Sequence, residues 1–407
     1  MRISSVLPDN NMQSTAASPR CPVWLTCALV LAPYAVPAVL HAQDASRVDV
    51  RVSATVLLNT FFTSTRTNNF DIPQVALRPS AADSLGEGGG VGLTVRQTRV
   101  GVHAFWPDVH GAEVRAEVDA DFYGGQQQSG FGDLMPLLRV RRAIVDVAWD
   151  RASLLVGQEV PLIAEYNPLS FATVGLSGLS NSGNLWLWVP QLRGGVRLVR
   201  TEQLRLDVDA AIVGAGTNEP AGELLVQPDR AEQSNRPALQ ARAMLRWGTA
   251  ERPGDVSVGL HRGWLATAGD SSLASSAVTA ALRLPLGTRA TFTGEAFTGQ
   301  ALTGLGGGGV GQFLGVNNVP VQTTGGWGQL VVELPRRVAV AGAWGMDDPD
   351  DNDLDASGRL RNVTTMGAVH WTPAPFIVAL EVRRMTTTYR SGLRSGTHVN
   401  LAVGIGF

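Results

Sequence analysis

Cysteine is absent from most of this 407-residue sequence. The two cysteines of the chain, Cys21 and Cys27, lie in an N-terminal segment in which basic residues precede a long, mostly apolar run. Such a segment, followed here by Leu-His-Ala, is typical of a cleaved signal peptide. We therefore predict a signal peptide over residues 1–42 and a mature chain, 43–407, without disulfides or thiol catalysis. Two alternatives stay open at this end of the chain: a lipid anchor at Cys27 and translation from Met12.

Long apolar runs and charge are also scarce. Beyond the N-terminal segment, no window approaches the roughly 20 apolar residues that a membrane-spanning helix needs. Only 17% of the residues are charged, and the 33 basic residues, all of them arginine, nearly cancel the 35 acidic ones. These features argue against a helical membrane protein, and the charge balance gives no support to a nucleic-acid partner.

The last stretch of the chain, residues 397–407, has a clear two-residue repeat. Apolar side chains from Val399 to Phe407 fall on one face, and small or polar side chains fall on the other. A strand of this kind suits a barrel whose outside meets lipid and whose inside meets water. It must pair with the first strand, because an open edge would leave unpaired backbone groups in hydrocarbon. Residues 47–59 repeat the pattern and are the expected partner.

The same repeat predicts sixteen strands in all. They span residues 47–59, 97–104, 112–122, 138–149, 152–160, 190–200, 204–215, 237–248, 255–266, 275–284, 288–299, 326–334, 337–346, 360–372, 376–389 and 396–407. The connections alternate between long loops and short turns, the first short turn being Trp106-Pro107-Asp108. Short periplasmic turns and long outer loops are the arrangement of outer-membrane proteins. We therefore predict an all-β fold, a transmembrane antiparallel β-barrel located in the outer membrane of a Gram-negative cell.

Tryptophans support this topology. Trp106, Trp149, Trp247 and Trp371 all lie at strand ends beside predicted short turns. Tryptophan is enriched where a membrane meets water, so these four are expected to form an aromatic girdle at one rim. The alternative, that they are ordinary core tryptophans, does not explain why they gather at the same end.

One segment resembles a known family. Gly157-Gln158 ends the predicted fifth strand, and Tyr166-Asn167-Pro168, Asn181 to Trp186 (Asn-Ser-Gly-Asn-Leu-Trp) and Pro190-Gln191-Leu192-Arg193 follow. This segment resembles the DcaP-like porins, relatives of the group that includes the phosphate-selective porins O and P. The close match covers residues 157–193, and Glu159-Val160 departs from the aromatic residue that such porins often carry there. The resemblance implies a homotrimeric diffusion channel, narrowed by its third long loop, that passes small hydrophilic and often anionic solutes.

The loop at residues 161–189 has the features of a constriction loop. It is long and too apolar to stay in water, so we expect it to fold into the barrel and narrow the pore. Asn167, Asn184 and Trp186 are its candidate site residues. The alternatives are a loop that caps the outer mouth and one that packs on a neighbouring subunit.

Charged side chains on the lumenal face are candidates for selecting solutes. Alternation places basic Arg99, Arg115, Arg193, Arg197, Arg242 and Arg246 and acidic Glu117 and Asp119 among the pore-lining residues. For most single arginines, a salt bridge that braces the wall is the competing interpretation. Arg193 and Arg197 are the strongest candidates, because both should lie on one wall beside the returning constriction loop and attract an anion.

Other functions have less support in the sequence. The mature chain has only His103, His110, His261, His370 and His398, none beside a serine or carboxylate motif, so we predict no enzyme activity and no catalytic residues. A structural or adhesive barrel without channel function is the main alternative. The acidic run at residues 347–355 offers hard oxygen ligands for Ca²⁺ but lacks an EF-hand pattern, and a solvated loop is the competing interpretation. No cofactor or metal is predicted; the expected partners are outer-membrane lipid, lipopolysaccharide and small solutes.

Overall fold

The computed structural model describes residues 48–407 except 81–87, 129–133, 215, 218–227, 250 and 269–270. The predicted signal peptide, residues 1–42, lies outside the described residues. Among the described residues, no helix is both long enough and apolar enough to cross a membrane.

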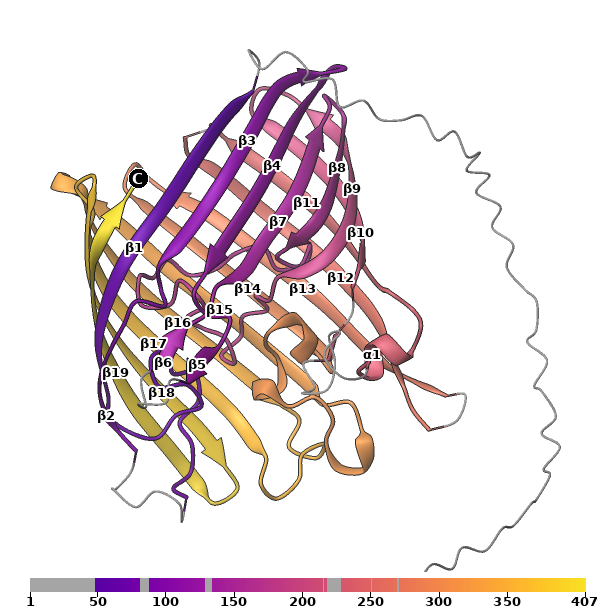
Figure 1. Ribbon diagram of the computed structural model, residues 1–407. Helices are drawn as coiled ribbons and strands as arrows, with labels where there is room; N and C mark the ends of the chain where they lie inside the picture. The colour runs from indigo at the N-terminus through magenta and orange to yellow at the C-terminus, as the bar shows by residue number, and fades with distance from the viewer. Residues whose placement is uncertain are drawn as a thin grey trace, which may run out of the picture. The chain divides into compact units, whose positions relative to one another are not determined.

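The described chain is an antiparallel sheet closed on itself (Figure 1). Its strands are β1 (Asp49–Thr63), β2 (Gly90–Thr94), β3 (Arg99–Val109), β4 (Ala112–Asp121), β7 (Arg139–Ala148), β8 (Ala152–Glu159), β9 (Val189–Arg200), β10 (Leu204–Val213), β11 (Ala238–Gly248), β12 (Pro253–Ala266), β13 (Ser272–Leu286), β14 (Ala290–Gln300), β15 (Gln322–Leu334), β16 (Val338–Pro349), β17 (Arg359–Trp371), β18 (Phe376–Tyr389) and β19 (Gly392–Gly406). Both β2 and β3 pair with β1, so they are two parts of one barrel strand, and the seventeen strands of the sheet make a sixteen-strand barrel. The predicted strand number and fold class are confirmed.

Short elements lie in the connections. A hairpin of β5 (Gln126–Gln128) and β6 (Leu134–Pro136) lies between β4 and β7, and α1 (Arg230–Gln233) precedes β11. Four short 3-10 helices complete the described elements: η2 (Thr303–Leu305), η3 (Gly309–Gly311), η4 (Val316–Asn318) and η5 (Pro335–Arg337).

The first and last strands close the barrel, as the C-terminal repeat predicts. β1 and β19 lie side by side (Figure 1) and pair from Thr55 with Gly406 to Thr63 with His398. At the end of the chain, Phe407 exchanges two backbone hydrogen bonds with Ala54, of 2.9 and 3.0 Å. The ladder therefore continues to the last residue, so the sheet has no open edge at this seam.

The two faces of each strand differ as lipid and lumen require. On β12, Val256, Val258 and Leu260 are exposed on the outer face, whereas Asp255 and His261 are buried on the inner face. Side chains of a strand alternate between its two faces, so the apolar residues form an outer band and the polar ones line the inside.

Two details of the connections correct the predicted boundaries. Pro107 and Asp108 belong to β3, and the turn lies instead at His110-Gly111, where both residues have positive φ and the Asp108 carboxylate accepts from Gly111 N at 2.9 Å. At the opposite end of the barrel, where the alternation predicts long loops, the connections 267–271 and 390–391 are as short as the turns. Serine and threonine pairs across strands, such as Thr386 with Ser395 at 3.1 Å, extend the ladders past the apolar band.

Candidate functional site in the barrel lumen

The connection between β8 and β9, residues 160–188, lies inside the barrel, and we call it the lumenal loop. Its Tyr166 N donates to the Glu295 carboxylate on β14 at 2.8 Å, and the Asn59 amide on β1 donates to Phe171 O at 2.9 Å. Since β14 and β1 are not neighbours in the sheet, the loop extends between separate parts of the inner wall.

The second half of the lumenal loop touches the inner wall directly. The Asn362 amide donates to Asn181 O at 2.8 Å. Gly183 has φ +93°, and a Cβ on this residue would lie 2.2 Å from Gly326 O on β15. Only glycine allows so close an approach of two backbones, which explains the glycine at this point of the loop.

The three loop residues singled out from the sequence have different surroundings. Asn184 is fully buried, and its Nδ2 donates to Asn167 Oδ1 at 3.1 Å and to Ser177 Oγ at 2.6 Å. Trp186 Nε1 donates to Ser180 Oγ at 2.7 Å. Asn184 thus braces the two limbs of the loop, whereas Asn167 and Trp186 line two different cavities.

One of these cavities, of about 640 Å³, lies between the lumenal loop and the inner wall, and we call it the arginine chamber. Six guanidinium groups and three carboxylates line it: Arg99, Arg141, Arg142, Arg193, Arg246 and Arg283, with Glu159, Glu165 and Asp255. Four of these arginines also contact carboxylates outside the lining, namely Asp119, Asp121, Glu117 and Asp207.

A β-bulge on β7 places two of these arginines in the chamber together. Asp119 on β4 pairs with Arg142, whereas the next residue, Ala120, pairs with Val140, so Arg141 is an extra residue in the ladder. Strict alternation would turn either Arg141 or Arg142 outward, but the bulge lets both point inward.

The chamber arginines differ in how far their charges are neutralised. Arg142 Nη1 lies 2.5 Å from Glu117, and its Nε is 2.9 Å from Glu159. By contrast, Arg193 and Arg283 have no carboxylate within 4.0 Å among the residues that the structure describes. The charge of these two guanidinium groups is therefore not neutralised by a carboxylate at this distance.

Arg141 is the most enclosed of the chamber arginines. Its side chain is 9% exposed and lies 3.5 Å from Asp119 and from Asp121. Its Nε and Nη1 have no hydrogen-bond partner within the described protein, and its guanidinium stacks 4.5 Å from the centre of the Trp188 ring. Arg283 stacks in the same way on Tyr166, at 4.5 Å. Aromatic faces thus hold two guanidinium planes in fixed orientations.

A second cavity, of about 420 Å³, also borders the lumenal loop. Gln74, Asn181, Trp186 and Arg359 are among its lining residues. Arg139 also lines it and lies 5.4 Å from the Trp188 ring, the same ring that Arg141 approaches. Arginines on β7 thus line both this cavity and the arginine chamber.

Only some of the predicted pore-lining residues lie in the arginine chamber. Arg99, Arg193 and Arg246 line the chamber, and Glu117 and Asp119 pair with its arginines. Arg242 lies beside the chamber, held by Asp209 at 2.8 Å and by Glu165. Arg115 and Arg197 lie toward the short-turn end of the barrel, where Arg197 Nη1 donates to the backbone carbonyls of Trp149 and Asp150. Arg193 and Arg197 therefore do not share a site, contrary to our expectation from the sequence.

Sequence reasoning missed Arg141, Arg142, Glu165, Tyr166 and Trp188 as chamber residues. The available signal was the run of arginines at 139, 141 and 142, which breaks the two-residue repeat and so indicates a bulge. The two-residue repeat does not predict where Glu165, Tyr166 and Trp188 lie, because these residues belong to a connection and not to a pleated strand.

The acidic run at 347–355 does not gather its carboxylates. Asp347 is buried on the inner face and accepts from Thr323 at 2.6 Å, whereas Asp348 faces outward and pairs with Arg361 at 2.9 Å. Within the described part of the chain, no group of three or more histidine, cysteine or acidic residues is arranged to hold a metal ion.

No protein-family model matches the sequence, and a search of curated proteins found no match. Solved structures do match. The outer membrane channel DcaP of Acinetobacter baumannii is 19% identical with a TM-score of 0.68, and the match covers 89% of this chain and 98% of that one. An anion-selective porin from Comamonas acidovorans is 12% identical with a TM-score of 0.56, over 88% of this chain and 100% of that one.

A third match is OmpF of Salmonella typhi in complex with daunomycin, which is 8% identical with a TM-score of 0.54, over 88% of this chain and 94% of that one. At these identities the matches establish the fold, and the first two of these proteins are an outer membrane channel and an anion-selective porin. The chain is therefore an outer-membrane porin-like β-barrel whose fold is similar to that of DcaP, in agreement with the resemblance of residues 157–193 to the DcaP-like porins.

Proposed function

We propose that the protein is a water-filled diffusion channel for small hydrophilic anions, with the lumenal loop as its constriction and the arginine chamber as its selective element. The observation that carries the proposal is that Arg193 and Arg283 line the chamber with no carboxylate within 4.0 Å among the described residues. Ionised side chains around a narrow passage raise the local concentration of ions of opposite sign. The anion-selective porin from Comamonas acidovorans has a similar fold, which is consistent with this proposal.

Position within the lumen decides which arginines act on a passing ion. The Debye length is about 8 Å at physiological salt, so charges at a wide mouth are screened whereas charges beside a narrow passage are not. Arg193 and Arg283 line the chamber, face no carboxylate within 4.0 Å among the described residues, and are the proposed selective residues. We further propose a homotrimer, the assembly that the DcaP-like resemblance implies.

The test is the reversal potential of the purified protein in planar bilayers under a salt gradient. We predict that Arg193→Gln with Arg283→Gln lowers the anion-to-cation permeability ratio about fourfold. A unit charge about 8 Å away in water stabilises an anion and destabilises a cation by roughly 0.5 kcal/mol each, and screening over one Debye length lowers each energy to about 0.2 kcal/mol. The ratio should therefore fall about twofold for each arginine removed. The change should shrink as salt is raised.

Arg197→Gln is the matched control, because it removes a guanidinium from the short-turn end of the barrel and should change the ratio much less. A double mutant with the wild-type ratio at low salt would show that the selective residues lie elsewhere. Absence of solute-driven swelling in liposomes that contain the protein would instead favour a structural or adhesive barrel.

A further inference from the structure

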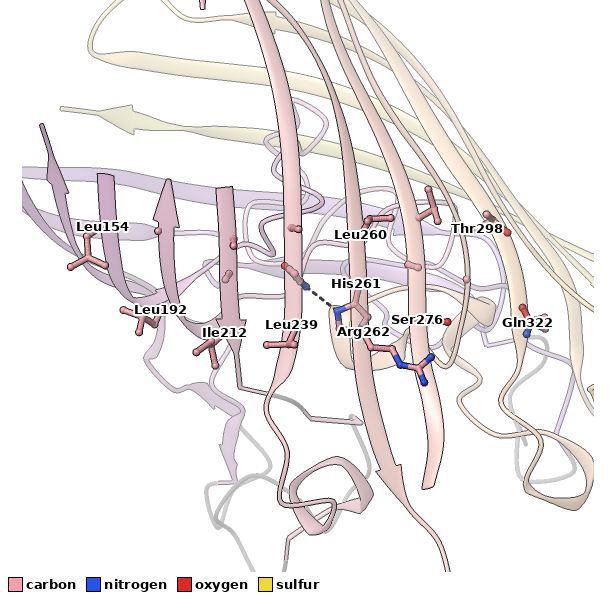
Figure 2. Close-up of a pocket in the computed structure, with 18 residues that line it drawn as sticks. Leu154, Leu192, Ile212, Leu239, Leu260, His261, Arg262, Ser276, Thr298 and Gln322 are labelled. Carbon is pink, nitrogen blue, oxygen red and sulfur yellow. Dashed lines mark hydrogen bonds between the residues drawn. The ribbon is translucent and has the colours of Figure 1, made fainter. Parts of the chain in front are cut away.

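The outer wall carries an open groove of about 1060 Å³ across strands β8 to β15 (Figure 2). Strand register explains its position. The outward residues Gly194, Ala210 and Ala241 are directly paired on the neighbouring strands β9, β10 and β11. Leu154 pairs with Gly194 at one end of this row, and Leu260 pairs with Ala241 at the other. Because the three middle side chains are so small, the wall is depressed between two leucines.

The next outward row, nearer to the long loops, changes from apolar to polar along the wall. Leu192, Ile212 and Leu239 are cross-strand neighbours, and the row continues with Arg262 on β12 and Ser276 on β13 (Figure 2). The depression therefore has aliphatic side chains along most of its loop-side border and a guanidinium group at one corner.

Arg262 has no counter-charge. It is exposed on the outer face, and no carboxylate lies within 4.0 Å of it among the described residues. Its described contact is with the Trp264 ring, 5.9 Å away, and Arg236 lies 5.8 Å from the same ring. Arg361, another outward arginine near the loop end of the wall, differs in being paired with Asp348 at 2.9 Å.

An apolar depression with an unpaired guanidinium at its loop-side edge is complementary to an anionic lipid. The aliphatic rows would cover acyl chain, since burying apolar surface is favourable for both partners. The guanidinium fork matches the oxygens of a phosphate. Long loops face the cell exterior in such barrels, so Arg262 lies at the level of the outer-leaflet headgroups.

We propose that this groove is a binding site for lipopolysaccharide, with acyl chain over Gly194, Ala210 and Ala241 and a lipid phosphate on Arg262. The site lies outside the lumen, so it does not depend on the proposed selectivity of the channel.

The test measures binding of purified lipopolysaccharide to the delipidated full-length protein, read as the concentration dependence of the thermal unfolding temperature. We expect Arg262→Gln to weaken binding about fivefold, the change that one interfacial arginine gives. Removing the lipid phosphates should weaken binding to the wild type equally and should not affect Arg262→Gln further. Arg361→Gln should bind as the wild type does. Ala210→Phe, which keeps every charge but fills the depression, should also weaken binding.

Equal affinity of the wild type and Arg262→Gln, or equal affinity for phosphorylated and dephosphorylated lipid, would overturn the phosphate site. Undiminished binding by Ala210→Phe would overturn the acyl position. If Arg262→Gln changes the oligomer size measured by light scattering but not the lipid affinity, the groove is a subunit interface and the proposal is wrong.

Discussion

At the scale of single residues, the charge of the arginine chamber depends on which carboxylates stay ionised. Burial by itself favours the protonated form of Glu165, but the charge and hydrogen bond of Arg242, with Arg246 and Arg193 nearby, outweigh burial and lower the pKa of Glu165. The ordinary pKa of glutamate is about 4.3, so Glu165 carries its negative charge throughout the neutral and mildly acidic range.

We therefore predict that Glu165→Gln makes the channel more anion-selective. The substitution removes one of the three carboxylates of the chamber lining, and the permeability ratio should rise about twofold. The difference from the wild type should be the same at pH 5 and pH 8. It should disappear only in acid below the ordinary titration range of glutamate, where Glu165 of the wild type is protonated as well.

Reversal potentials at several pH values measure this effect, and Glu113→Gln, in an exposed residue on β4, is the control. A difference that is present at pH 8 but absent at pH 5 would mean that Glu165 titrates in this range and that the ion pair with Arg242 does not hold its pKa down.

At the residue scale, the sequence predicts the face on which a side chain lies but not its contacts. Alternation predicts correctly that Arg193 and Arg197 share the inner face of β9. It does not predict that Arg197 donates to the carbonyls of Trp149 and Asp150 while Arg193 faces the chamber. The pleat fixes the face of a residue, whereas the conformation of a long side chain depends on neighbours from other strands.

At the scale of elements, the lumenal loop is held by many separate contacts with the inner wall. Its apolar Leu179 and Leu185 are almost fully buried, in agreement with the expectation that this loop is too apolar for solvent. The sequence could predict the length and burial of the loop, but not its partners. Hydrogen bonds such as that from Tyr166 N to Glu295 join residues far apart in the chain, and no local pattern encodes them.

Gly183 gives a test of this element. We predict that Gly183→Ala displaces the loop, because a Cβ would lie 2.2 Å from Gly326 O and the φ of +93° is strained for any L side chain. Left-handed backbone alone costs roughly 1–2 kcal/mol for a residue other than glycine. Single-channel recordings should show a higher and noisier conductance, since the displaced loop would no longer act as the proposed constriction.

Gly342→Ala on β16 is the matched control, because a Cβ there meets no atom within 4 Å. The control should conduct like the wild type. Should Gly183→Ala also keep the conductance and unfolding temperature of the wild type, the close approach of the loop to β15 does not hold the constriction in place.

At the scale of the whole molecule, the sequence was most informative. A barrel wall between lipid and water forces the same two-residue repeat on every strand, so sixteen strands and their closure could be predicted without any partner information. Features that interrupt the repeat were missed. The β7 bulge and the division of the second barrel strand into β2 and β3 both depend on local pairing with a neighbouring strand.

The orientation of the barrel gives the last prediction. With the short turns in the periplasm, single cysteines at Gln233 and Ser357 on the loop side should react with an impermeant maleimide on intact cells, and those at Glu202 and Thr288 should not. Gln233, Ser357, Glu202 and Thr288 are all exposed, so burial does not decide the outcome. Thr288 is preferred to its neighbour Gly287, whose φ of +63° would strain a cysteine. All four should react equally once the outer membrane is permeabilised, which controls for reactivity, because residues 43–407 contain no cysteine. Labelling of Glu202 and Thr288 variants on intact cells would show that the barrel lies in the opposite orientation, and the predicted periplasmic girdle of tryptophans would then face the cell exterior.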